Sequence, residues 1–155
     1  LSMSHTQMEK PGHPVPGQAT FYSRAGKDFR KAVPVDTRYK LAGGGYLSTV
    51  SDVCRLGTAY LQEEIASPDT LNPFLTSCEV AGKPTWYGLG WQVSKDARGR
   101  SFYGHVGNTV GAYSNIFVYP QQELVFSILV NCSVPGVQPV FDQVVDAVHQ
   151  SLSNS

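Results

Sequence analysis

The sequence predicts an α+β fold in which an antiparallel sheet is flanked by helices. Four β-prone runs follow one another between positions 87 and 131, and their short connections favour antiparallel neighbours. Two apolar stripes at helical spacing, one near position 50 and one at the end of the chain, predict the flanking helices. A length of 155 residues corresponds to about one domain.

The first elements predicted are a tail and a small hairpin. Residues 1–19 are rich in Pro and Gly and lack periodicity, so they are expected to form a tail, a linker or a cloning remnant, with the domain occupying residues 20–155. Residues 21–33 contain two short β-prone runs separated by Gly26, a pattern that predicts a hairpin with the glycine in its turn.

A glycine-rich segment, residues 41–47, leads into the first predicted helix. Ser48 or Thr49 suits the N-cap, and Asp52 in the first turn would face the positive end of the helix. The apolar stripe of this helix comprises Val50, Val53, Cys54, Gly57, Tyr60 and Leu61. Three prolines make residues 67–85 irregular, with a short helix expected near residues 71–77.

The sheet is expected to contain four strands, at residues 87–93, 100–106, 112–119 and 124–131. The second and third strands would be joined by a five-residue turn from Gly107 to Gly111. The last strand is almost entirely apolar, which suits a strand covered on both faces.

The C-terminal helix is predicted to start near Pro139, because proline is tolerated in the first helical turn. Valine is a weak helix former, so packing against the sheet is expected to hold this helix. The predicted contact residues are Val140, Phe141, Val144, Val145 and Val148. His149 lies outside this stripe and is expected to be solvated.

Composition excludes several classes of function. Twelve basic and 12 acidic residues balance to zero, and no basic block occurs, so a nucleic-acid partner is not expected. No apolar run approaches the ~20 residues of a membrane span, and no signal peptide is visible. Three cysteines without a CxxC spacing predict reduced thiols, and neither a metal nor a cofactor is expected.

The segment from Tyr103 to Gly111 is the strongest candidate for a site. It places His105 among three glycines, which let a ligand approach the backbone closely. The alternative is a glycine-rich turn with an exposed histidine. Tyr87 and Trp91, upstream, are expected to be core or cleft-wall residues.

Three motifs in order strengthen the case for a site. They are Gly44-Gly45-Tyr46-Leu47-Ser48-Thr49-Val50-Ser51-Asp52, Tyr87-Gly88-Leu89-Gly90-Trp91 and Gly104-His105-Val106-Gly107. Together they resemble the serine beta-lactamase-like family of penicillin-recognising hydrolases, over about residues 20–150. The resemblance extends to the family's mitochondrial branch through residues 35–40. It implies the C-terminal part of a beta-lactamase/transpeptidase-like fold.

The resemblance also implies roles for individual residues. His105 would point into the cleft and hold a substrate carboxylate or a proton network. The backbone N–H of Asn108 would be one oxyanion donor, and Gly107 would keep that backbone reachable. Val106 stands where the family usually has Thr or Ser, and Asn108 where it usually has Gly, and both departures weaken the expected binding of a substrate carboxylate.

The family's Ser-x-x-Lys nucleophile motif is absent, because no serine here has Lys three residues later. Tyr113-Ser114-Asn115 matches the family's Tyr-x-Asn motif in letters, but it follows the His-x-Gly strand, and Tyr113 is expected to be packed. The sequence therefore looks like the C-terminal portion of a longer serine hydrolase, inactive alone, whose parent cleaves a small peptide-like or ester substrate.

Three alternatives stay open: a short paralogue that lost catalysis, a ligand-binding homologue, and a non-catalytic scaffold. The scaffold would assemble as a homo-oligomer or filament through an exposed sheet edge. A mitochondrial location is implied by the resemblance alone.

Overall fold

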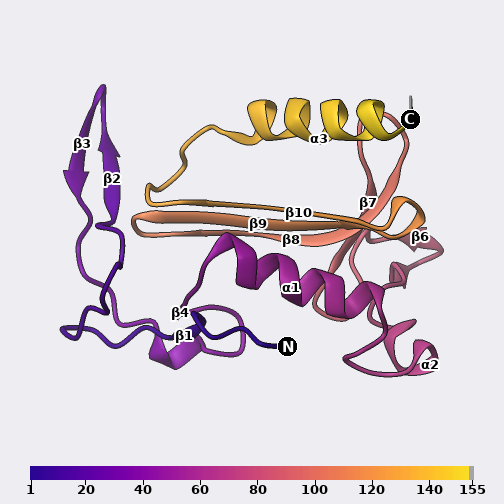
Figure 1. Cartoon of the computed structure of the whole chain (residues 1–155), viewed down its shortest axis with the longest axis horizontal. Helices are drawn as coiled ribbons and strands as arrows, with labels where there is room; N and C mark the ends of the chain where they lie inside the picture. The colour runs from indigo at the N-terminus through magenta and orange to yellow at the C-terminus, as the bar shows by residue number, and fades with distance from the viewer. Residues whose placement is uncertain (154–155) are drawn as a thin grey trace.

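The fold is built on a four-stranded antiparallel sheet with one helix on each face (Figure 1). The computed structural model describes residues 1–153. The strands are β7 (Gln92–Lys95), β8 (Ser101–Thr109), β9 (Ala112–Tyr119) and β10 (Leu124–Val130), in the order β10-β9-β8-β7. The helices are α1 (Val50–Leu61) and α3 (Gln138–Ser153). The predicted α+β fold class is confirmed.

The hairpin between β8 and β9 is tighter than the sequence predicts. Thr109 pairs with Ala112, so only Val110 and Gly111 form the turn. Gly111, the second residue of the turn, has a φ of +82°, a left-handed conformation that glycine adopts freely. The predicted five-residue turn from Gly107 is therefore wrong, and Gly107 is a strand residue paired with Ser114.

The first strand of the sheet begins later than predicted. Residues 87–91 form a tight loop in which the Gly88 N–H bonds the Trp91 carbonyl and Gly90 has a φ of +90°. A Cβ on Gly88 would lie 2.1 Å from the Phe74 carbonyl oxygen, so the backbone there passes directly against a neighbouring loop. The two glycines of the Tyr-Gly-x-Gly-Trp motif thus serve a turn, and β7 starts only at Gln92.

Helix α1 approaches its face of the sheet closely. A Cβ on Gly57 would lie 2.5 Å from Val125 Cγ1, so only glycine permits this spacing. The helix starts as predicted, with the Thr49 side chain accepting a bond from the Asp52 N–H. The core on this side consists of Trp91, Tyr103, Ile116 and Val118, with Val53, Tyr60, Leu61, Leu75, Val93 and Val125 packed against it.

Helix α3 covers the opposite face through Phe141, Val145 and His149, which are all buried. Two of the predicted contacts are wrong, because Val140 and Val144 are 62% and 51% exposed. The predicted solvation of His149 is also wrong: the side chain is only 6% exposed and lies against the rings of Tyr119 and Phe126. Aromatic side chains on this face of the sheet provide the surface on which Phe141 and His149 stack.

The N-terminal segment contacts the domain. Strand β1 (Gln7–Met8) pairs with β4 (Tyr46–Leu47). The His5 N–H and the Thr6 hydroxyl both donate to Oδ2 of Asp52, at 2.8 and 3.0 Å. Asp52 lies in the first turn of α1, as predicted, and is fully buried beneath this segment.

The remaining elements are short. The predicted hairpin is confirmed as β2 (Tyr22–Ala25) and β3 (Asp28–Lys31). The other elements are η1 (Arg38–Lys40), α2 (Pro68–Leu71), β5 (Glu79–Val80), β6 (Lys83–Pro84) and η2 (Pro120–Gln122). The short helix expected near residues 71–77 is found earlier, as α2, which shares only Leu71 with the predicted range. Over residues 1–153, every helix is too short or too polar to cross a bilayer.

Candidate functional site

The His-x-Gly strand has one open edge. Strand β7 pairs with β8 only as far as Gly104, which lies opposite Gln92. From His105 to Thr109, β8 pairs with β9 on one side, and no described strand pairs with it on the other. An unpaired strand edge presents backbone donors and acceptors to whatever lies beside it.

The register identifies which backbone groups face outward. In a two-residue hairpin the closing pair, here Thr109 and Ala112, exchanges hydrogen bonds. Antiparallel pairs alternate, so Gly107 and His105 also direct their backbone groups toward β9. Val106 and Asn108 therefore turn their N–H and C=O groups toward the open edge. An N–H in such a place can donate to a ligand oxygen.

His105 is exposed and is held by two contacts. Its Nε2 lies 2.6 Å from the hydroxyl oxygen of Tyr87, and its Nδ1 lies 2.9 Å from the carbonyl oxygen of Val106. Tyr87 also meets the imidazole edge-on, with ring centroids 5.9 Å apart.

The other candidate side chains do not converge on His105. Val106 packs into the core beneath α3, on the opposite face of the sheet from Tyr103. The Asn108 side chain accepts a bond from the Val134 N–H at 3.4 Å. A Cβ on Gly107 would lie 2.6 Å from Ser114 Oγ, so glycine lets the strands pass closely here. At the open edge Val106 and Asn108 therefore offer backbone groups.

The Tyr-x-Asn letters at Tyr113 belong to the packing of α3. The Tyr113 hydroxyl donates to Oε1 of Gln138 at 2.7 Å, and the Asn115 amide donates to the same oxygen at 3.3 Å. The prediction that Tyr113 is a packed strand residue fits these contacts.

Sequence reasoning missed the contact between Tyr87 and His105. It placed Tyr87 in the core or cleft wall, because residues 87 and 105 are far apart in the chain. The signal was present in the Tyr-Gly-x-Gly-Trp motif, whose turn returns the chain to β7 beside Gly104. The loop of residues 87–91 folds back on the start of β7, and this brings Tyr87 to His105 on the neighbouring strand β8.

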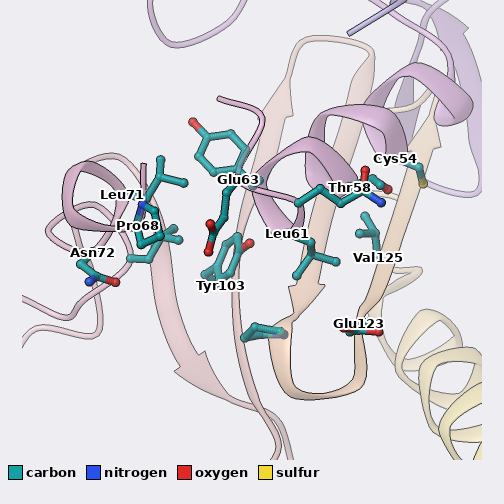
Figure 2. A pocket seen from close by; sticks show the side chains of 14 residues that line it. Cys54, Thr58, Leu61, Glu63, Pro68, Leu71, Asn72, Tyr103, Glu123 and Val125 are labelled. Atoms are coloured by element: carbon teal, nitrogen blue, oxygen red, sulfur yellow. The ribbon is translucent and has the colours of Figure 1, made fainter. Parts of the chain in front are cut away.

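A cavity of about 560 Å³ lies elsewhere, between α1, α2 and the turn joining β9 to β10 (Figure 2). Its walls include Leu61, Leu71, Tyr103 and Val125, and the carboxylate of Glu63 lies between Leu71 and Tyr103 in this view. Burial raises the pKa of Tyr103 to about 12. None of His105, Val106, Gly107 or Asn108 lines this cavity.

The site offers no cluster of metal ligands. Within residues 1–153, no three His, Cys, Asp or Glu side chains come together as a bound metal ion would require. The chemical groups at the open edge of β8 are one imidazole, one phenol and the peptide groups of Val106 and Asn108. These groups can bind and polarise a ligand through hydrogen bonds.

Comparisons with known proteins agree on one family. The sequence profile described as Beta-lactamase matches residues 1–150. The mitochondrial serine beta-lactamase-like protein LACTB of Mus musculus is 31% identical over 162 residues, covering 87% of this chain and 29% of its own length. The chain thus spans less than a third of this curated relative.

Two solved structures share the fold. A penicillin-binding protein from Bacillus halodurans superposes with a TM-score of 0.71 at 18% identity, covering 94% of this chain and 45% of the other. A D-stereospecific amidohydrolase from Streptomyces sp. gives a TM-score of 0.69 at 22% identity, covering 84% and 40%. The chain therefore has the fold of a little under half of each of these two proteins. Taken with the profile match and the LACTB similarity, this shows that the chain belongs to the beta-lactamase family.

Proposed function

We propose that this chain is the C-terminal portion of a serine hydrolase that cleaves an amide or ester through an acyl-serine intermediate. The observation that carries the proposal is the open edge of β8, where His105 and the outward peptide groups of Val106 and Asn108 lie together. The family membership and the partial coverage of the relatives support it.

The acyl transfer has two steps that place demands on this edge. A serine oxygen attacks the carbonyl carbon of the substrate, and the leaving amine or alcohol departs with a proton. Water then hydrolyses the ester that remains. In both steps the carbonyl oxygen becomes an oxyanion, which backbone N–H groups stabilise. The Asn108 N–H is the donor that this strand would contribute.

His105 is assigned to the binding of the substrate carboxylate or to the proton network. An imidazole donates one hydrogen bond when neutral and two when protonated, and it carries a positive charge in the second state. Val106 contributes its outward peptide group and lacks the hydroxyl that Thr or Ser would offer. Gly107 keeps the strand close to its neighbour at Ser114.

The nucleophile is proposed to come from a Ser-x-x-Lys helix outside these residues, and the chain alone is proposed to be inactive. The substrate class is a small peptide-like or ester molecule. A mitochondrial location and assembly through a sheet edge stay predictions.

The test is acylation by a fluorescent penicillin. The 155-residue chain is expected to remain unlabelled, because it has no serine positioned by a Lys three residues later. A full-length protein that carries the proposed upstream Ser-x-x-Lys is expected to be labelled. In that protein His105→Ala should slow labelling and leave folding almost unchanged, because an exposed side chain contributes little packing.

The matched control is His13→Ala, which removes another exposed histidine that lies far from His105 in the sequence. It should label at the parent rate. Stoichiometric labelling of any serine within the 155 residues would refute the absence of the nucleophile. Equal labelling of the His105→Ala and parent proteins would remove His105 from the mechanism.

A further inference from the structure

We propose that Tyr87 is a positioning residue that fixes the tautomer and ring orientation of His105. The proposal builds on the two contacts of the imidazole, one to the Tyr87 hydroxyl and one to the Val106 carbonyl. Its structural part stands without the proposed function. Its consequence for ligand binding rests on that function.

The Val106 carbonyl and the Tyr87 hydroxyl together determine where the imidazole proton lies. A carbonyl oxygen only accepts hydrogen bonds, so the 2.9 Å contact requires that Nδ1 of His105 carry the hydrogen and donate it. In the neutral ring Nε2 then has a free lone pair. The Tyr87 hydroxyl, 2.6 Å away, donates to that lone pair. The neutral His105 is therefore held as the Nδ1–H tautomer.

The Tyr87 backbone is fixed by several hydrogen bonds. Its carbonyl accepts from the Cys78 N–H at 2.8 Å and from the Thr85 hydroxyl at 3.0 Å. Its own N–H donates to the Thr85 hydroxyl oxygen at 3.3 Å. These bonds tie Tyr87 to the loop that precedes it, so the phenol approaches the imidazole from a supported backbone.

Two neighbours of Tyr87 show that the chain is constrained here. Trp86 has a φ of +59°, a left-handed conformation that costs a bulky residue energy, and its carbonyl accepts from the Val93 N–H at 3.0 Å. Gly88 lies where any Cβ would collide with the Phe74 carbonyl. Because both sides of Tyr87 are held, its Cα is fixed relative to β7, and the ring reaches Nε2 from that fixed backbone.

The arrangement has a consequence for ligands. Both nitrogens of the neutral imidazole already have partners, so a ligand at this edge meets the Tyr87 oxygen before it meets a free ring nitrogen. Tyr87 is an exposed residue, and its phenol oxygen keeps a lone pair for a donor on the ligand. A ligand that bonds directly to Nε2 has to displace the hydroxyl.

The experiment measures the tautomer by ¹⁵N NMR of the side-chain nitrogens of His105, in the neutral state of the ring. It uses the 155-residue chain and therefore needs no catalytic activity. The parent chain is expected to show a protonated Nδ1 and an unprotonated Nε2. Tyr87→Phe, which deletes only the hydroxyl, is expected to shift the ring toward a mixture of tautomers with a measurable Nε2–H population.

The matched control is Tyr39→Phe, which deletes a hydroxyl from a tyrosine that is 81% exposed. It should leave the His105 signals at their parent positions. Amide spectra of each variant report whether the fold is intact, so a general disturbance is separated from the local effect. Unchanged His105 nitrogen signals in folded Tyr87→Phe, or an Nε2–H tautomer in the parent chain, would overturn the proposal.

The outcomes separate this inference from the proposed function. An Nδ1–H tautomer that depends on Tyr87, in a full-length protein that fails to acylate, would uphold the positioning role and reject the hydrolase. Acylation by the full-length protein, together with a His105 tautomer that is the same in Tyr87→Phe as in the parent, would uphold the hydrolase function and reject the positioning role of Tyr87.

Discussion

Helices α1 and α3 cover opposite faces of one sheet by different means. Helix α1 lies close to the strands because Gly57 has no side chain where Val125, Ile116 and Val118 approach. Helix α3 stacks larger side chains, Phe141 and His149, on the aromatic residues of its face. The contact of α1 depends on the missing side chain of Gly57, and the contact of α3 depends on large side chains. Stability should therefore fall when a side chain is enlarged on α1 and when one is shortened on α3.

Polar contacts also distinguish the two helices. Asp52, at the start of α1, accepts hydrogen bonds from the N-terminal segment. It also forms an ion pair with Arg55 of the same helix, with 2.6 Å between the guanidinium nitrogen and the carboxylate oxygen. Midway along α3, Asp146 forms ion pairs with Arg98 and Arg100 of the β7–β8 connection. Arg100 also forms an ion pair with Asp96. Hydrogen bonds from these arginines hold the pKa of Asp146 below its usual value. These ion pairs thus attach α3 to the β7–β8 connection, and they help to fix which face of the helix lies on the sheet, because the apolar stripe of α3 would allow more than one face to do so.

Removing a large side chain from α3 is expected to have the greatest effect. Phe141→Ala deletes a buried ring and should lower the free energy of unfolding by about 3–5 kcal/mol. The adjacent Val140→Ala should change it by less than about 0.5 kcal/mol, because Val140 is mostly exposed. Urea unfolding of both variants tests this, and equal losses would show that α3 seats on a different face.

Adding atoms to α1 should come next. Gly57→Val introduces methyl groups where a single Cβ already lies within 2.5 Å of Val125, and overpacking of this kind costs about 1–3 kcal/mol. Gly44→Ala is the control, because a Cβ there would meet nothing closer than 3.9 Å. Thermal unfolding gives the comparison. A Gly57→Val protein as stable as its parent would contradict the close seating of α1.

The smallest effect concerns pH. Burial lowers the pKa of His149 below its usual 6.5, and its Nε2 has no hydrogen-bond partner within residues 1–153. The unfolded chain therefore takes up the proton first, so this contribution to stability is full above pH 6.5 and is lost as the pH falls below that value. The slope is at most about 1.4 kcal/mol per pH unit for one proton.

His149→Phe should remove that slope between pH 7 and 5. It should also stabilise the protein at pH 7 by about 1 kcal/mol, because the buried nitrogen without a partner is gone. His5→Phe, at the opposite end of the chain, serves as the control and should keep the parent slope. A parent protein whose stability does not change over this range would place His149 in contact with water.

The elements of the fold could be predicted from local patterns, and the missed features are tertiary. Strand β9 and the start of α1 follow from a clean β-prone run and a clear N-cap, both of which are local signals. The valines of α3 form a stripe broad enough to allow two seatings. Only the aromatic side chains across the sheet select the face that carries Phe141 and His149.

The candidate site could be predicted as a strand, but its contacts were not predicted. The glycines around His105 indicated a site, yet glycine fits both a turn and a closely packed strand, so the hairpin was placed too early. Tyr87 reaches His105 because the loop of residues 87–91 folds back on β7 and β7 pairs with β8, a relation that one sequence does not contain. The buried contact between Asp52 and residues 5–6 was missed for the same reason.

The most direct test of the central claim, that β8 offers an open edge at the site, is amide hydrogen exchange along this one strand. Gly104 bonds β7, while His105 and Gly107 bond β9, so these three amides are expected to exchange slowly. The Val106 and Asn108 amides, which face the open edge, should exchange much faster. Alternating protection across residues 104–108 is the predicted result. Uniform protection would mean that the edge is covered and that no ligand reaches these peptide groups.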